Sequence, residues 1–190
     1  MTPTVENVIS VYLAATDDEV SEGMAWYPDA GCFAETLAGD FWHRAAGVIA
    51  ALSPMSDWDN NMAKAEQLYR QNGEGSGCGL YRNVAKAIAI YNGEDALDVL
   101  GGDKVRSFYL NIVEPDGDHQ TVVIDRHAFD IAVGCVTDDK SRSVLARKGE
   151  YDRFSDVYRK AALLAGIGAS QMQAITWVAW RNGKGTTWLG

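Results

Sequence analysis

The sequence predicts an all-α fold, and two of its features carry this prediction. Apolar residues recur three and four positions apart along most of the chain, as on the buried face of an amphipathic helix. Glycine, proline, asparagine and aspartate interrupt these segments at intervals that suit ordinary helices. The apolar run at 121–124 fits a strand or an extended lead-in equally well. We therefore expect a helical protein with at most a short pair of strands.

The N-terminal part of the chain predicts helices at residues 5–15, 19–26, 30–37, 41–52 and 58–71. Pro28 and Asp29 are expected to form a turn between the second and third of these helices, because proline lacks the amide hydrogen that a helix interior uses. Ser53 and Pro54 should end the fourth, because the residue before proline avoids helical geometry.

A glycine-rich loop at 72–79 comes next. Residues 114–119 predict a turn, Gly166 a helix C-cap and Ser170 a helix N-cap. The helices predicted for this part span residues 83–91, 95–100, 105–112, 126–133, 141–148, 153–164 and 170–181.

The composition limits the class of protein. Of 190 residues, 47% are hydrophobic and 23% are charged, which suits one folded domain or two small lobes with a shared core. No segment is apolar for long enough to span a bilayer, so no membrane partner is expected. The N-terminal segment carries acids and no basic region, so a secretory signal is not expected and the cytoplasm is the expected location.

The cysteines and the net charge restrict the chemistry further. Cys32, Cys78 and Cys135 form no Cys-x-x-Cys pair and no cluster with histidine, so neither a metal site nor a cofactor is expected. The net charge of -9 opposes tight binding to a nucleic-acid backbone, which draws on Lys and Arg. A local positive groove can coexist with a negative total, so a DNA-directed enzyme is not excluded.

Three segments occur in an order that is typical of one enzyme superfamily. Residues 48–69 read VIAALSPMSDWDNNMAKAEQLY, an apolar helix, the loop Leu-Ser-Pro-Met where the superfamily has a Leu-Ser-x-Gln-type loop, and a polar helix. Residues 79–91 read GLYRNVAKAIAIY, a helix that begins with Gly-Leu-Tyr. Residues 100–134 run from LGGDKVRSFYLNI to VVIDRHAFDIAVG, where the superfamily has a glycine hairpin and then Val-Asp-Thr-His before a helix. In these segments the chain resembles the endonuclease III-type branch of the helix-hairpin-helix DNA glycosylases.

The resemblance covers a little under half of the chain and implies both a fold and an activity. The implied fold is a two-lobed helical one with a central cleft, with lobes at about 48–134 and at 1–47 plus 135–190. The implied activity is directed at a base that is flipped out of the DNA duplex. Compact size, the absent cysteine cluster and the motifs IDRHA and SxxQAITWVAWR are also similar to bacteriophage glycosylase-like proteins of thymine hypermodification. These attach an amino acid or amine to an activated 5-hydroxymethyl-pyrimidine, which would add a small amine donor as partner and place the protein in a host cytoplasm.

Two departures from the superfamily pattern change the expected chemistry. Asp103 follows Gly101 and Gly102 in the hairpin turn, and its charge would weaken a contact with a phosphate. The lysine of the bifunctional members falls at Arg106, which stays protonated and cannot form a Schiff base, so a lyase reaction is not expected.

Asp125 is the predicted catalytic residue. An apolar run precedes it and a helix follows it, so it fits a helix N-cap. By the resemblance it would instead face C1′ of a flipped nucleotide and stabilise positive charge there. The two roles are compatible. His127 is expected to support the loop of Asp125 beside the substrate.

The other predicted site residues lie in two places in the sequence. Met55 corresponds to the side chain that the superfamily inserts into the gap left by the base, and a gap-filling core residue is the alternative. Ser53, Trp58 and Asn61 would line the substrate pocket, although Asp57 or Asp59 also fits a simple helix cap there. Besides Met55, the predicted DNA-contacting residues are Gly101, Gly102, Lys104, Arg106 and Ser107. Trp177 and Trp180 are expected in the core.

Two classes of function stay open. The first is an enzyme that acts on a DNA base, by N-glycosidic cleavage or by group transfer, with weak and salt-dependent DNA binding. The second is a glycosylase-like module that binds DNA or protein without catalysis. Asp125 favours the first class, whereas the acidic charge and the altered hairpin favour the second. The substrate base and the oligomeric state cannot be predicted from the sequence.

Overall fold

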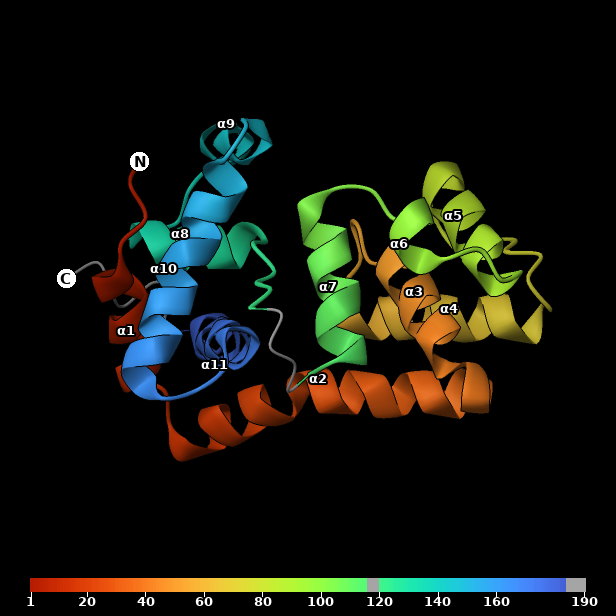
Figure 1. The fold of residues 1–190 in the computed structure, drawn as a ribbon, viewed down its shortest axis with the longest axis horizontal. Helices are drawn as coiled ribbons and strands as arrows, with labels where there is room; N and C mark the ends of the chain where they lie inside the picture. The colour runs from red at the N-terminus through yellow and green to blue at the C-terminus, as the bar shows by residue number, and fades with distance from the viewer. Residues whose placement is uncertain (116–119, 184–190) are drawn as a thin grey trace. The chain divides into compact units, whose positions relative to one another are not determined.

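The computed structural model describes residues 1–115 and 120–183, and it confirms the all-α prediction (Figure 1). Within these ranges, there is no β-strand. The run at 121–124 is an extended lead-in. The Tyr151 hydroxyl donates to the Val122 carbonyl at 2.9 Å and accepts from the Ile124 amide at 3.0 Å. One tyrosine thus satisfies backbone groups that a neighbouring strand would otherwise pair.

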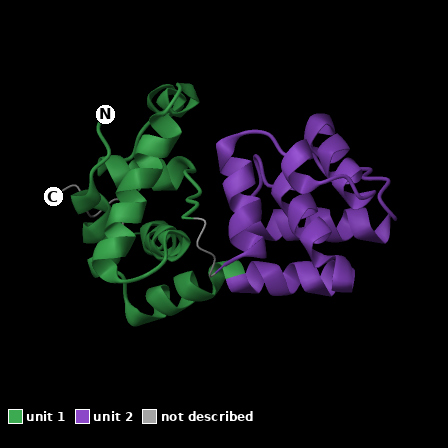
Figure 2. Cartoon of the chain, viewed as in Figure 1, with its two compact units in different colours: residues 1–27, 116–190 green, residues 28–115 purple. Residues whose placement is uncertain are grey.

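The chain divides into two compact units, Met1–Tyr27 with Asp116–Gly190 (unit 1) and Pro28–Pro115 (unit 2) (Figure 2). These differ from the lobes expected at 48–134 and 1–47 plus 135–190. The segment 28–47 belongs with unit 2 because the helix that begins at Trp42 packs against three later helices of that unit. The segment 120–134 belongs with unit 1 because its helix packs against the N-terminal and C-terminal helices.

In unit 1, four helices, α1, α8, α10 and α11, pack against one another. The unit contains α1 (Val5–Leu13), the first part of α2 (Asp17–Ala38), α8 (Arg126–Val133), α9 (Asp139–Arg142), η2 (Ser143–Ala146), α10 (Glu150–Ala165) and α11 (Ala169–Arg181). Helix α8 packs against α1, α10 and α11. Phe129 stacks on Phe154 with ring centroids 4.5 Å apart, and the Tyr158 hydroxyl donates to the Ala128 carbonyl at 2.8 Å. These contacts fix the position of α8, at whose start Asp125 lies.

Unit 2 is built around α3. It contains the rest of α2, η1 (Gly39–Phe41), α3 (Trp42–Leu52), α4 (Trp58–Arg70), α5 (Tyr81–Tyr91), α6 (Ala96–Val99) and α7 (Asp103–Val113). Helix α3 packs against α4, α5 and α7, and its residues from Ala45 to Leu52 are all buried. Gly47 permits this close packing, because a Cβ there would lie 2.9 Å from side-chain atoms of Ile90 and Ala96.

Two local predictions are wrong. The turn expected at Pro28 does not form, and α2 continues through it from Asp17 to Ala38. Proline costs that helix one amide hydrogen bond, but Gly23, Tyr27, Ala30 and Ala34 are all buried and keep helical spacing across it.

The second error concerns the start of α11. Gly168 is its N-cap instead of Ser170, and the Gly168 amide donates to Gln171 Oε1 at 2.8 Å. Gly166 is the expected C-cap of α10, with a left-handed φ of 71°. The turn expected at 114–119 lies mostly outside the described residues. None of the described helices has both the length and the apolarity that crossing a membrane requires.

Candidate functional site

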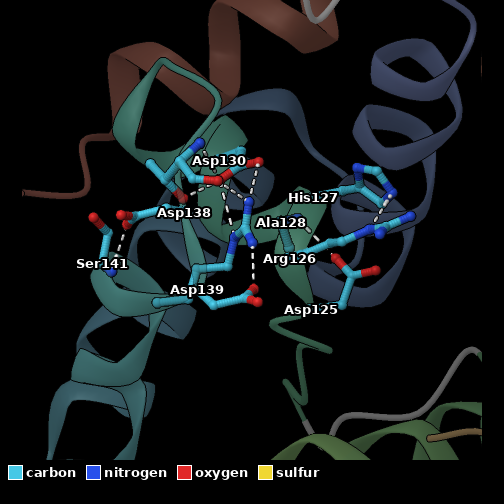
Figure 3. A network of polar contacts seen from close by, with 10 residues as sticks. Asp125, Arg126, His127, Ala128, Asp130, Asp138, Asp139 and Ser141 are labelled. Atoms are coloured by element: carbon cyan, nitrogen blue, oxygen red, sulfur yellow. Dashed lines mark hydrogen bonds and ion pairs between the residues drawn. The ribbon is translucent and has the colours of Figure 1, made fainter. Parts of the chain in front are cut away.

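Asp125 is the N-cap of α8 (Figure 3). Its Oδ1 accepts a hydrogen bond from the Ala128 amide at 2.8 Å, as the capping interpretation predicts. Tyr151 holds the extended residues before Asp125 through two backbone hydrogen bonds. The backbone position from which the Asp125 side chain projects is therefore fixed. Its side chain is half-buried, and part of its surface is open to solvent.

The second oxygen of Asp125 has a partner far along the chain. Asp125 Oδ2 accepts from the indole Nε1 of Trp177 at 3.0 Å. Trp177 was expected in the core with Trp180; Trp180 is buried, but Trp177 is only half-buried. Its polar edge explains the difference, because an indole N–H needs an acceptor and the half-buried carboxylate supplies one. Sequence reasoning missed this pair, which is 52 residues apart.

His127 lies beside the same tryptophan. The two ring centroids are 6.3 Å apart in an edge-to-face arrangement. Burial lowers the pKa of His127 from its ordinary value of 6.5, and the negative charge of Asp125 opposes this shift. The neutral imidazole is therefore favoured. The role of His127 in supporting the loop of Asp125 stays a prediction.

A second carboxylate of α8, that of Asp130, is already engaged by its neighbours. It is buried, it accepts from the Thr137 amide at 3.1 Å, and it forms an ion pair with Arg142 at 3.2 Å (Figure 3). Asp130 thus holds the segment after α8 in place. Of these two residues, Asp130 is buried and Asp125 is only half-buried.

In unit 2, Met55 occupies a strained turn between α3 and α4. The Ser56 amide donates to the Ser53 carbonyl at 3.2 Å, and Met55, the third residue of this turn, has a φ of 63°. Proline second and a positive φ third are features of a type II turn, in which glycine or asparagine is usual at the third position. The Met55 side chain is 91% exposed, so the gap-filling alternative is wrong. The insertion of Met55 into a base stack stays a prediction.

The predicted pocket residues around this turn have different environments. The Ser53 hydroxyl donates to the Ala50 carbonyl at 2.9 Å, and Asp57 caps α4 by accepting from the Asn60 amide at 2.9 Å. Trp58 is half-buried, with its ring 6.2 Å from that of Phe33. Asn61 is 2% exposed, and no described residue gives its Oδ1 a hydrogen bond.

In the predicted hairpin between α6 and α7, the glycines are exposed, whereas Arg106 and Ser107, which follow them, are engaged or buried. Gly101, Gly102 and Lys104 are exposed, and Gly102 has a φ of 82°. The Arg106 guanidinium donates to the carbonyls of Leu97 and Leu100 instead of projecting outward. Ser107 is 9% exposed and offers little surface to a phosphate.

Two lysines that the sequence did not single out lie beside these features. Lys64 Nζ donates to Ser56 Oγ at 3.0 Å, at the base of the Met55 turn. Lys86 Nζ lies 3.3 Å from the place of a Cβ on Gly101. In the sequence, these two lysines show only that they belong to helices. Helical spacing does not show which neighbour the side chain of a lysine contacts.

The predicted site residues therefore form three groups. Asp125 and His127 lie together in unit 1. Ser53, Met55, Trp58 and Asn61 belong to the α3–α4 connection and α4, and the hairpin residues to the start of α7, all in unit 2. The convergence of these groups on one cleft stays a prediction.

Unit 1 also has a cavity of about 300 Å³ along α10, with a lining of Gln120, Asp156, Arg159, Lys160, Ala162, Leu163 and Ile167. Arg159 is bound there to Asp156 at 2.7 Å and to Asp152 at 2.8 Å, so its charge is largely balanced. Across the described part of the chain, no three His, Cys, Asp or Glu side chains are grouped so that they could hold a metal ion.

Comparison with protein families places the chain. Residues 1–184 match a family described as "Family of unknown function (DUF7178)", and the chain belongs to this family. Comparisons with curated proteins and with solved structures found no match.

Proposed function

We propose that this protein is a DNA-base-directed enzyme of the helix-hairpin-helix glycosylase type, with a two-lobed fold and Asp125 as the catalytic carboxylate. The observation that carries the proposal is the state of Asp125. A helix cap uses one carboxylate oxygen, yet both oxygens of Asp125 are held by donors, and the residue is only half-buried. An ordered and accessible carboxylate can stabilise positive charge on a bound substrate.

The substrate would be a pyrimidine nucleotide flipped out of DNA. In the cleavage reaction, the bond between C1′ and the base breaks, and the base leaves with the bonding electrons. Asp125 stabilises the cationic sugar until water adds to C1′, and the proton that the water loses goes to the departed base. In the transfer reaction, an amine nitrogen bonds to the exocyclic methylene carbon of an activated 5-hydroxymethyluracil, and the activating group leaves with the bonding electrons. The Asp125 carboxylate can accept the proton that the amine loses. Both reactions use the active-site carboxylate, so cleavage and transfer are both candidate activities.

Unit 2 supplies the groups that suit DNA in this proposal. Met55 is an exposed apolar side chain on a strained turn, of the kind that fills the gap in a base stack. Lys64 at this turn, with Lys86 and Lys104 at the hairpin, provides positive charge for phosphates. With few such cations and a net charge of -9, DNA binding should be weak and strongly salt-dependent.

A second candidate is a binding module without catalysis. The observation that favours it is the hairpin itself, where Arg106 faces backbone carbonyls and Asp103 adds negative charge to the first turn of α7. A module of this kind would bind DNA or protein through unit 2 and would leave the base unchanged.

The experiment is a product assay with the full chain. Duplex and single-stranded DNA carrying thymine, 5-hydroxymethyluracil or its activated form are incubated with and without amino-acid donors. Mass spectrometry follows base release and mass gain separately. Base release supports cleavage, and mass gain that depends on the donor supports transfer. Binding without either product on every substrate overturns the enzyme proposal in favour of the module.

A further inference from the structure

We infer that Trp177 is the residue that positions Asp125 for its chemistry, an inference that rests on the proposed function. The capping bond from Ala128 holds Oδ1 alone, and the terminal torsion of an aspartate is broad. The Trp177 indole N–H, 3.0 Å from Oδ2, adds the second fixed point. The plane of the carboxylate is thereby set by two helices, α8 and α11.

Trp177 is itself in contact with two other side chains. The Arg181 guanidinium, one turn further along α11, lies 4.4 Å from the centroid of the Trp177 ring. The Trp26 ring from α2 lies 5.8 Å away, with an interplanar angle of 69°. The neighbouring residues of α11, Thr176 and Val178, are buried. The donor is therefore a rigid one.

This arrangement leaves acceptor capacity for a substrate. An ionised carboxylate has about four lone-pair directions, and the two donors here use one on each oxygen. The remaining direction on each oxygen has a fixed orientation, as a group that faces a developing cation requires. Trp177 does not touch the reacting atoms, so its role is to position the residue that does.

The test compares Trp177→Phe, which keeps an aromatic ring but removes the N–H donor, with Trp42→Phe as the matched control, because Trp42 is also half-buried and belongs to unit 2. In the full chain, ¹³C NMR reports the Asp125 carboxyl carbon, and thermal unfolding confirms that both variants fold. We expect that carbon to shift in Trp177→Phe and to stay close to the wild-type value in Trp42→Phe. We also expect kcat to fall on the order of tenfold in Trp177→Phe, with KM little changed, because one charge-assisted hydrogen bond is lost.

The outcomes separate this inference from the proposed function. An unchanged Asp125 carboxyl resonance in Trp177→Phe overturns the positioning role, whether or not the protein forms product. Full activity in Trp177→Phe, together with its loss in Asp125→Asn, overturns the positioning role and leaves the function standing. If wild type forms no product, the function fails, and the resonance still decides the contact. The reciprocal test follows the NMR resonance of the Trp177 indole N–H, which donates to Asp125. This resonance should shift in Asp125→Asn and should not shift in Asp138→Asn.

Discussion

Replacing Met55 by asparagine should stabilise the protein. Met55 holds a φ of 63°, which costs a residue with a Cβ about 1 kcal/mol, and asparagine tolerates this conformation better than other such residues. The side chain is 91% exposed, so its removal sacrifices almost no buried apolar surface. For a chain of this length, a gain of about 1 kcal/mol corresponds to a rise in Tm of roughly 2–4 °C. Met55→Ala is the matched control, because it removes the side chain and keeps the strain.

The assay is thermal unfolding followed by circular dichroism, with wild type, Met55→Asn and Met55→Ala under the same conditions. Met55→Ala should melt close to wild type. A Tm for Met55→Asn at or below that of Met55→Ala would refute the strain argument. The proposed insertion role has its own readout, the fluorescence of 2-aminopurine next to the target base. Both variants should lose most of the increase in fluorescence that wild type produces, and a full increase in Met55→Ala removes Met55 from the insertion site.

Two further predictions concern unit 1. Because burial lowers the pKa of His127, its contribution to stability is complete above the unfolded pKa of about 6.5 and is lost as the pH falls towards the lowered folded value. Asp125→Asn removes the charge that opposes this shift, so NMR titration of the imidazole should show a still lower pKa of His127; an unchanged or higher pKa contradicts the assigned contact. Arg142→Ala should lower the free energy of unfolding by about 3–5 kcal/mol, because it leaves the Asp130 carboxylate buried without its ion pair. Arg70→Ala, in an exposed pair, should cost less than about 1 kcal/mol by the same denaturant titration, and equal losses in the two variants would contradict the difference in burial.

The sequence predicts most helices of this fold because apolar periodicity and end signals agree. The segment 126–133 is an example, since Asp125 caps it and Gly134 ends it with a left-handed φ of 77°. It fails at Pro28, where burial on both sides of the proline outweighs one lost hydrogen bond. The local sequence shows the hydrogen bond that the proline removes, but it does not show the tertiary packing that compensates for this loss.

The candidate site was predictable only in part. Asp125 can be identified from the sequence because an apolar run ends just before it and a helical pattern begins just after it. Its partner Trp177 does not, since an indole at helical spacing in an apolar segment resembles any core residue. The inward orientation of Arg106 was also hidden, because nearby carbonyls compete with an external phosphate for a guanidinium and the sequence does not show their directions. Side-chain direction across elements is the information that the sequence lacks.

The most direct measurement of the central claim is product formation by Asp125→Asn. Asparagine can still cap α8 but carries no charge. The matched control is Asp138→Asn, because Asp138 caps α9 in the same way, by accepting from the Ser141 amide at 2.8 Å. If the Asp125 charge stabilises a cationic transition state, the rate should fall on the order of a hundredfold or more, while Asp138→Asn stays close to wild type. Undiminished product formation in Asp125→Asn would show that Asp125 is a helix cap and that the chemistry lies elsewhere.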